Sequence, residues 1–439
     1  MNTPSVPVLA AVVLGVTAHL LFAADPPEPK FREVTIDPKI QIGYGVAVAD
    51  VDGDKLPDIL LADKKQFVWY RNPGAEKSGD PAAWQKHLLA ENLTKQDNVC
   101  LAAQDIDGDG RCEIAVGAEW NPGDTINSGA VFYLIPPADR TQPWTPVKLH
   151  AEPTTHRMRW IKLEAARLPT PAPSPLDADG PPRQSFDKWG LVVVPLHGRG
   201  NKNGEGAGVK VLLYHPPAQL NDPNGEWKTE LIDESMHMTH NFAVTRPGPN
   251  RPQTPTLLLS GKEGLVIASY EGQRWLHAPL PEFKEAMGEN FKGIGEVRDL
   301  HAGLRSFAAT VEPMHGTSLV IYRDDSGERD RMVWTRHVLT DKLSDGHGLA
   351  CGDLLGLGSD QIVVGWRGKP GAPDSTTGVA VWTPLDPQGE KWRETNIDPT
   401  GMACEDLQLA DLNGDAKLDI VASGRATKNV KIYFNETAR

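Results

Sequence analysis

Residues 50–58 read Asp-Val-Asp-Gly-Asp-Lys-Leu-Pro-Asp, and the pattern returns as Asp-Ile-Asp-Gly-Asp-Gly-Arg-Cys-Glu at 105–113 and Asp-Leu-Asn-Gly-Asp-Ala-Lys-Leu-Asp at 411–419. Oxygen-bearing side chains at positions 1, 3, 5 and 9 of a tight loop can surround a hard cation such as Ca²⁺. An EF-hand would need glycine at position 6 and glutamate at position 12, and position 12 is apolar in every copy. The repeat therefore predicts a calcium loop of another kind.

The expected ligands of structural calcium are Asp50, Asp52, Asp54, Asp58, Asp105, Asp107, Asp109, Glu113, Asp411, Asn413, Asp415 and Asp419. The longer side chain of Glu113 changes the reach of the last ligand in the second copy. The alternative interpretation is a solvated acidic turn without metal. Short apolar runs stand on both sides of each loop, such as 46–49 and 59–61, and their lengths suit β-strands. Each loop is thus expected to connect two strands of a hairpin.

A second repeat consists of aromatic residues that open alternating, edge-strand-like segments, at Phe31, Trp84, Trp144, Trp227, Trp275, Trp334 and Trp392. Between them lie pairs of apolar runs, which completes seven sets of four strands. The last set has no such segment after 430–434, so the first strand, from Phe31, is expected to complete it. The sequence predicts an all-β fold, a seven-bladed β-propeller over residues 25–439.

Composition and charge narrow the class of partner. The formal net charge is −13 and no Lys/Arg-rich run occurs, which argues against nucleic acid. The apolar run at 6–23 precedes a Pro-rich polar segment, as in a signal peptide spanning residues 1–24. We therefore expect export to a periplasmic or extracellular location, with no membrane association after cleavage; an uncleaved N-terminal anchor is the alternative. A Pro-rich insertion at 168–188 is expected in the third blade.

Cysteine content leaves disulfide bonding open. Cys100, Cys112, Cys351 and Cys404 allow three pairings, their spacing does not match a zinc finger, and buried free thiols are the alternative.

The repeats resemble the FG-GAP/VCBS family of calcium-stapled propellers, which includes the heads of integrin α-chains. The resemblance covers essentially the whole chain after residue 24. It implies that the metal loops join the first and second strands of a blade on the lower face, and that ligands meet the upper face. The acidic loops are then expected to hold hairpins in place, with any chemistry on the opposite side.

The upper face should collect the turns between second and third strands, with one ionisable side chain from each blade: Lys64, Glu119, His197, Lys262, Glu312, Arg367 and Arg425. The connections between blades should add a second ring near the channel, formed by Tyr44, His240, His347 and Glu405, with Asn98, Arg157, Arg159 and Glu296 in approximately corresponding places. Convergent His, Glu and Arg side chains favour shifted pKa values and proton transfer. The alternative is that these are ordinary polar turns and hydrogen-bonded histidines.

Segments such as 44–54, 63–72, 237–242 and 346–353 resemble, more narrowly, the propeller domain of aldos-2-ulose dehydratase-like proteins. That resemblance implies elimination of water from keto- or anhydro-sugars.

Two functions compete on these grounds. In the first, the chain is a carbohydrate lyase or dehydratase: His240 or His347 is the base, Tyr44 the acid, and cations such as Lys262 and Arg367 stabilise the developing anion. The substrate-binding residues are then Lys64, Glu119, His197, Glu296, Glu312, Glu405, Arg425 and Arg157, and a further divalent metal in the upper pocket is an option. In the second, the same rim binds a glycan or a protein partner without catalysis.

Overall fold

The structure is a computed structural model that describes residues 25–163, 188–246, 255–271, 274–279, 291–302, 305–324, 334–369, 371–372 and 374–438. The expected signal peptide at 1–24 lies outside these residues, and so does the expected insertion at 168–188 apart from residue 188. No helix in the described ranges is long and apolar enough to cross a membrane.

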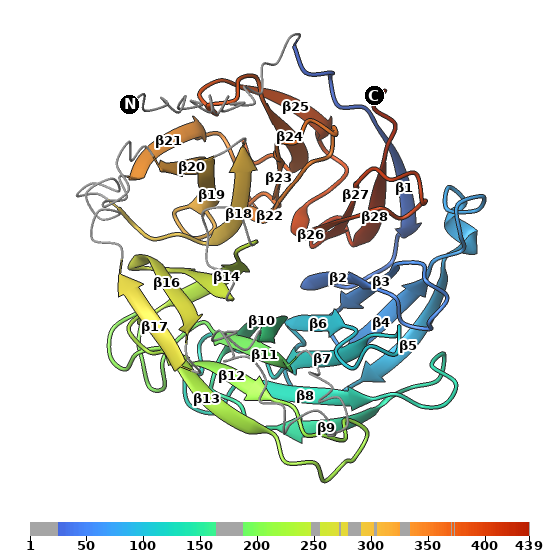
Figure 1. The fold of residues 1–439 in the computed structure, drawn as a ribbon, viewed down its shortest axis with the longest axis vertical. Coiled ribbons are helices and arrows are strands. Elements are labelled where there is room, and N and C mark those ends of the chain that lie inside the picture. The colour runs from blue at the N-terminus through green and yellow to red at the C-terminus, as the bar shows by residue number, and fades with distance from the viewer. Residues whose placement is uncertain are drawn as a thin grey trace, which may run out of the picture.

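Seven antiparallel four-stranded sheets are arranged in a ring around a central channel, which confirms the predicted seven-bladed β-propeller (Figure 1). Blades 1 to 3 consist of β2 (Gly45–Ala49), β3 (Asp58–Ala62), β4 (Gln66–Arg71) and β5 (Gln85–Glu91); β6 (Cys100–Gln104), β7 (Glu113–Ala118), β8 (Ala130–Ile135) and β9 (Thr145–Leu149); and β10 (Thr155–Leu163), β11 (Lys188–Pro195), β12 (Val211–His215) and β13 (Lys228–Asp233).

Blades 4 to 7 consist of β14 (Thr239–Val244), β15 (Thr256–Gly261), β16 (Gly264–Glu271) and β17 (Arg274–Pro279); β18 (Glu296–Ala302), β19 (Arg305–Glu312), β20 (Ser318–Asp324) and β21 (Trp334–Thr340); β22 (Gly346–Gly352), β23 (Gln361–Trp366), β24 (Gly378–Pro384) and β25 (Trp392–Asp398); and β26 (Cys404–Ala410), β27 (Asp419–Gly424), β28 (Asn429–Asn435) and β1 (Phe31–Asp37). The one helix in the described ranges is a short 3₁₀ turn, η1 (Pro81–Ala83).

The N-terminal strand closes the ring, as predicted. β1 pairs antiparallel with β28, so that the blue and red ends of the chain lie side by side in Figure 1. Just beyond the strand pair, the Lys30 amide donates to the Thr437 hydroxyl at 2.9 Å, and Arg32 pairs with Glu436 at 2.7 Å. The last blade is therefore built from both ends of the sequence.

Both faces of each sheet are covered by neighbouring blades, which explains why the middle strands are continuously apolar. β3 and β23 are buried at every position, whereas the outer strand β9 exposes Thr145, Pro146 and Lys148. Trp69 of blade 1 packs in one core cluster with Phe132 of blade 2. Burying one such large side chain contributes roughly 1.5–3 kcal/mol, and every blade interface repeats the arrangement.

The four cysteines are free thiols. Cys100, Cys112 and Cys404 are buried and Cys351 is half-buried. The structure thus agrees with the free-thiol alternative.

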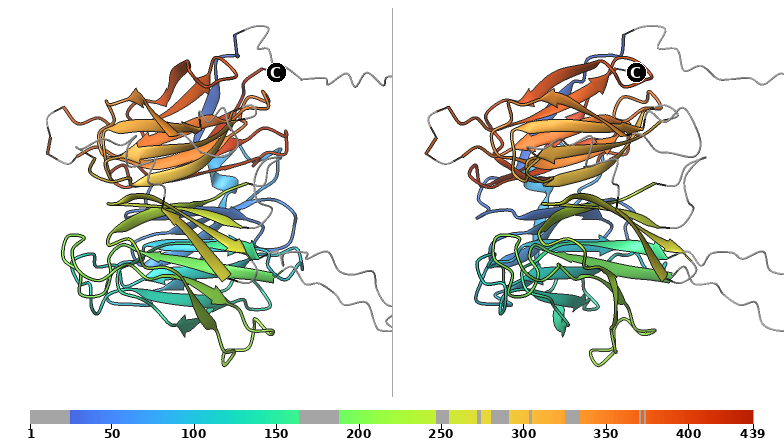
Figure 2. Two further views of the ribbon diagram at one scale, coloured as in Figure 1. Left: turned by 60° about the vertical axis from the view of Figure 1, so that its left-hand side comes forward. Right: turned by 90° about the vertical axis from the view of Figure 1, so that its left-hand side faces the viewer.

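The innermost strands of neighbouring blades contact one another around the channel, and turning the ring shows loops projecting from its two faces (Figure 2). The three acidic loops each join the first and second strands of a blade, as the resemblance implied. The inner strands therefore run from the opposite face, where they begin, toward the acidic loops.

Candidate functional site

Four inner strands have a β-bulge near their first residue, at equivalent positions. The pairing register slips between Thr155 and Arg157, between Thr239 and Asn241, between Gly346 and Gly348, and between Cys404 and Asp406. The residues left without a partner in the ladder are His156, His240, His347 and Glu405. A bulge re-aims a side chain and is often found next to active sites. Here it brings three histidines and one glutamate to the channel mouth.

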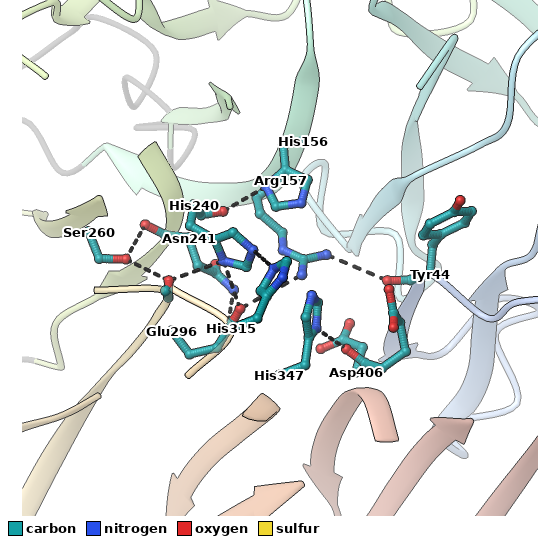
Figure 3. A network of polar contacts seen from close by, with 12 residues as sticks. Tyr44, His156, Arg157, His240, Asn241, Ser260, Glu296, His315, His347 and Asp406 are labelled. Carbon is teal, nitrogen blue, oxygen red and sulfur yellow. Dashed lines mark hydrogen bonds and ion pairs between the residues drawn. The ribbon is translucent and has the colours of Figure 1, made fainter. Parts of the chain in front are cut away.

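Three histidines meet at this mouth: His240 from β14, His347 from β22, and His315 from the turn between β19 and β20 (Figure 3). One ring nitrogen of each lies within 4.8 Å of the others. The Nε2 atoms of His240 and His315 are 2.6 Å apart, and the His315 and His347 ring centroids are 4.6 Å apart. We call these three residues the His cluster.

Backbone carbonyls fix the orientation of two of these rings. His240 Nδ1 donates to the Gly295 carbonyl at 3.2 Å, and His347 Nδ1 donates to the Glu405 carbonyl. Each ring therefore keeps the lone pair on Nε2, the arrangement usual for histidine ligands of metals. Burial, with the guanidinium of Arg367 next in importance, lowers the pKa of His347 well below its usual range, so the ring is neutral.

His315 has the opposite tautomer. Its Nδ1 accepts a hydrogen bond from Arg367 at 3.1 Å, so its Nε2 carries the proton that it donates to His240. Burial and the neighbouring His240 and Arg367 lower the pKa of His315 to about 2. The donor set of the His cluster fits a divalent transition-metal ion at His347 directly, and at His240 and His315 once Arg367 releases His315 Nδ1 and the proton leaves His315 Nε2.

His156 lies beside the cluster. Its Nδ1 donates to the His240 carbonyl at 2.8 Å, its ring stacks on Trp120 with centroids 4.8 Å apart, and it meets the His240 ring edge-on at 4.7 Å. Burial, followed by the charge of Arg157, lowers the pKa of His156 well below its usual range. A neutral imidazole whose Nδ1–H is committed presents the lone pair of Nε2, which suits a general base.

Arg157 and Glu296 form the charged part of the site. Arg157 Nη2 lies 3.8 Å from Glu296 Oε1, which is itself 3.2 Å from His240 Nδ1. Burial alone would raise the pKa of Glu296, but its contact with His240 and the guanidiniums of Arg298 and Arg157 hold that pKa well below the usual range. Glu296 therefore remains a carboxylate and Arg157 supplies positive charge beside the cluster.

A chain of ion pairs connects the cluster to the rim. Arg367 bonds Glu405 at 2.7 Å and Asp345 at 2.7 Å, and Glu405 also accepts from Arg425 at 2.9 Å. The Arg425 guanidinium lies 5.3 Å from the ring centre of Tyr44. Eight of the expected site residues are thus linked in one network through His315: Tyr44, Arg157, His240, Glu296, His347, Arg367, Glu405 and Arg425.

Tyr44 is less suited to give up a proton. Its hydroxyl donates to Asp97 at 3.2 Å, and burial raises its pKa to about 12.

Other expected rim residues lie apart from this network. Lys262 pairs with the exposed Glu205 at 2.7 Å, and Glu119 accepts from the Gln96 amide at 3.3 Å. Glu312 is buried inside blade 5, where it accepts from the Tyr322 hydroxyl at 2.6 Å and pairs with Arg336 at 2.8 Å.

Two further rim residues make no side-chain hydrogen bond to the cluster within the described residues. Lys64 lies in the turn after β3, where its backbone carbonyl accepts from the Asn98 amide. His197 follows β11, and its Nδ1 is buried without a hydrogen-bond partner in the described part of the chain.

The sequence interpretation missed His156 and His315. His156 could have been found because Thr155-His156 repeats the pair Thr239-His240 at the start of an inner strand. Because of the bulge, the residue at the channel mouth is His156, one position before Arg157. His315 carries no such signal, because β19 continues to Glu312 and the following turn is longer than expected.

The acidic loops lie on the far face from the cluster. Carboxylate oxygens of Asp50, Asp52 and Asp58 come within 4.8 Å of one another, as do those of Asp105, Asp107 and Glu113. Basic residues pair with the fifth positions, Asp54 with Arg71, Asp109 with Arg111 and Asp415 with Lys417, and Arg71 also pairs with Asp52 at 2.7 Å. In the third loop, Asp411 accepts from backbone amides of 414–416, Asn413 from the Asp415 amide, and Asp419 from Leu412 and Asn435.

Burial raises the pKa of the last carboxyl group in each loop: Asp58 to about 8, Glu113 to about 7 and Asp419 to about 6. These raised values mark carboxylates that are short of positive charge, which a bound cation would supply.

Comparison with known proteins gives two family matches. Residues 50–116 match the FG-GAP-like repeat, and residues 185–325 match the β-propeller domain of aldos-2-ulose dehydratase. The first stretch contains two acidic loops, and the second contains His240, Glu296 and His315. Both predicted resemblances are confirmed.

Aldos-2-ulose dehydratase of Phanerodontia chrysosporium is 23% identical to the chain over 380 residues. The match covers 81% of this chain and 37% of that protein, so the chain spans well under half of the relative's length.

Two solved structures align with the chain at low sequence identity. The BBS1N domain in complex with ARL6DN, soaked with mercury, aligns with a TM-score of 0.51 at 10% identity, covering 93% of this chain and 96% of that one. A lectin of Agrocybe aegerita that recognises non-reducing terminal N-acetylglucosamine aligns with a TM-score of 0.45 at 11% identity, covering 90% and 86%.

Proposed function

We propose that the protein is a carbohydrate dehydratase that removes water from a keto- or anhydro-sugar at the His cluster. The observation that carries the proposal is the meeting of His240, His315 and His347 with a fourth neutral histidine, His156, in a channel mouth. Support comes from the match of residues 185–325 to the propeller domain of a sugar dehydratase.

The reaction needs a base next to an acidified C–H bond. We assign the base to His156 on geometry, because its Nδ1–H is held by the His240 carbonyl and its Nε2 has no hydrogen-bond partner within the described residues. The lowered pKa of the ring makes it a weak base but a strong acid once protonated. The proton comes from the carbon next to the sugar carbonyl. As it leaves, negative charge develops on the carbonyl oxygen, and Arg157 is the cation that faces this charge.

The second half of the reaction expels the hydroxyl on the next carbon. Protonated His156 returns its proton to that hydroxyl, which leaves as water while the electron pair forms the carbon–carbon double bond. The product is a conjugated enone. We assign this acid step to His156 rather than to Tyr44, whose pKa of about 12 and bond to Asp97 oppose proton release.

A divalent metal fits the same site. His347 and, once Arg367 releases His315 and the proton leaves its Nε2, His240 and His315 would hold it, and it would polarise the sugar carbonyl as a Lewis acid. Three imidazole ligands leave a coordination position for an oxygen of the substrate.

We further propose that the acidic loops bind structural Ca²⁺, supported by the converging carboxylates of two loops and by the FG-GAP-like match. Export, guided by residues 1–24, remains part of the proposal; N-terminal sequencing of the secreted chain should begin near Asp25.

The test incubates the purified full chain, loaded with Zn²⁺, with 1,5-anhydrofructose and with 3-keto-glycosides, and follows the absorbance of the enone product. His156→Gln should lower kcat by about 10²–10⁴-fold. The matched control is His215→Gln, because His215 pairs with Glu230 in the outer half of blade 3; it should leave kcat within about twofold.

Full activity in His156→Gln would exclude the assigned base. Absence of turnover on every sugar, together with saturable glycan binding, would replace the dehydratase with a binding propeller.

A further inference from the structure

The channel continues past the His cluster into a second polar space. Farther along the inner strands, toward the acidic loops, lies a cavity of about 210 Å³ whose polar lining includes Arg157, Arg159, Asn241, Asp406 and Gln408. A neighbouring cavity of about 290 Å³ shares Arg159 and Gln408 and adds Arg298. Guanidinium groups are therefore concentrated in a channel whose walls are otherwise residues such as Val46 and Leu101.

These arginines are poorly matched with carboxylates. Arg159 Nη1 donates to the Asn241 side-chain oxygen at 3.2 Å and to the Phe242 carbonyl at 2.6 Å, both of which are neutral. Arg298 donates to the Val297 carbonyl at 2.7 Å and stands 3.5 Å from Glu296. Buried guanidiniums normally find an anionic partner, because desolvation of an unpaired charge is costly.

Arg157 shows the deficit most directly. It is 7% exposed, and its Nε is buried without a hydrogen-bond partner in the described part of the chain. Its other contacts are long: 3.5 Å from Nη1 to the Tyr44 carbonyl and 3.8 Å from Nη2 to Glu296. A buried donor that lines a polar cavity and has no acceptor in the described protein can be satisfied there by an ordered water or by a bound ion.

Two carboxylates stand closest to these guanidiniums, and both also have other hydrogen-bond or ion-pair partners. Glu296 is shared between Arg157 and Arg298. The carboxylate oxygens of Asp406 accept hydrogen bonds from the backbone amides of Val46 and Leu407. Burial also raises the pKa of Asp406, which weakens its negative charge. Arg246 and Asp299 line the neighbouring cavity together with Arg298, and Arg246 is satisfied there by Asp299 and Asp360.

We propose that the cavity of about 210 Å³ is a binding site for one small monovalent anion, held by the guanidinium groups of Arg157 and Arg159, with Arg298 in the neighbouring cavity adding positive charge. A halide and a small planar carboxylate share the required charge and size, and the guanidinium fork suits the carboxylate in particular. The anion would satisfy Arg157 and hold it beside the His cluster. The site does not depend on the proposed sugar chemistry, because its lining residues, apart from Arg157, take no part in that reaction.

The experiment measures thermal unfolding of the full chain in chloride, in formate and in the bulky anion gluconate, at constant ionic strength. A ligand specific for the folded state raises the folded-to-unfolded ratio in a saturable way; for a dissociation constant of about 10 mM, about 200 mM anion raises it about 20-fold. We expect Tm to rise with chloride, formate or both, and to stay flat with gluconate. A rise in Tm with chloride shows that the site binds a halide, and a rise with formate shows that it binds a small carboxylate.

Arg159→Met should abolish the response to chloride and formate. Arg199→Met is the matched control, because Arg199 is exposed and pairs with Glu152 outside the cavity; it should keep the full response. A bromide-soaked crystal of the unaltered chain provides a second readout that requires no variant to fold, and its anomalous peak should lie beside Arg157 and Arg159. Equal Tm values in all three anions, or bromide only outside the cavity, would overturn the proposal.

Discussion

The acidic loops and the His cluster are two candidate cation sites on opposite faces of one ring, and they are built in contrasting ways. Each acidic loop uses nine consecutive residues, and its first carboxylates are half-buried or exposed. The His cluster takes one buried or half-buried side chain from each of blades 4, 5 and 6. A local site fixes one hairpin, whereas an assembled site depends on the positions of whole blades. The first should therefore govern stability and the second chemistry.

The sharpest test of this contrast removes a cluster imidazole. His347→Ala should lower sugar dehydration by about 10³-fold or more, because it removes a donor from the group that polarises the carbonyl. Thermal unfolding and sugar turnover should be measured on the same preparation. The contrast would fail if activity and Tm fell together, which would make His347 a structural residue.

Removing calcium should produce the next largest effect, a decrease in thermal stability. Burial raises the pKa of Asp58 to about 8, whereas an unfolded aspartate titrates near about 3.9. Between these values the folded loop holds a proton that the unfolded chain releases, so the free energy of unfolding falls as pH rises toward 8. Glu113 and Asp419, with pKa values raised to about 7 and about 6, act in the same direction.

A bound cation replaces those protons, so Ca²⁺ should raise Tm more at pH 8 than at pH 5, by roughly 5 °C or more. Calorimetry with EDTA or with Ca²⁺ at each pH measures the difference. An equal gain at both pH values would argue against cation binding by the buried carboxylates.

A smaller effect should come from Arg367, which holds His315 in the tautomer that opposes metal binding. Arg367→Met removes this hydrogen bond and one positive charge, and should increase Zn²⁺ affinity about tenfold. Competition with a chromogenic chelator gives the affinity. Arg425→Met is the control, because Arg425 bonds the same Glu405 without contacting a cluster histidine; a similar gain there would point to general electrostatics.

The smallest effect is expected on the rim. Lys262→Met removes an exposed ion pair with Glu205 and should change both kcat and Tm little, with kcat within about twofold. A large fall in kcat with normal stability would show that Lys262 contacts the substrate and belongs to the site.

The blades could be predicted from sequence because their signals are local. Each acidic loop and each Trp-led outer strand recurs with its flanking apolar runs, and closure by Phe31–Asp37 followed from counting. His240, His347, Arg367 and Glu405 were also found, because strand ends can be estimated to within a residue or two.

The remaining site residues depend on events that the pattern does not encode. A shift in the pairing register of β10 with β11 places His156, and not Arg157, at the bulge of β10. At the end of β19 the carboxylate of Glu312 turns into its own blade toward Tyr322, and His315, three residues later, takes the place near the channel. Whether a polar residue near a turn faces solvent, its own sheet or the channel is decided by packing, which no single sequence segment reports.

Because β1 closes the ring from the other end of the chain, the protein could be divided into two pieces after Asp37. β28 offers one edge that β1 alone covers, through pairing from Phe31↔Asn435 to Asp37↔Val430. A chain that starts at Pro38 would expose the main-chain donors and acceptors of that edge, a template for strand addition. A synthetic peptide of residues 25–37 should therefore dock there and restore the blade, so the ring can be opened and resealed in trans without altering a residue at the channel mouth.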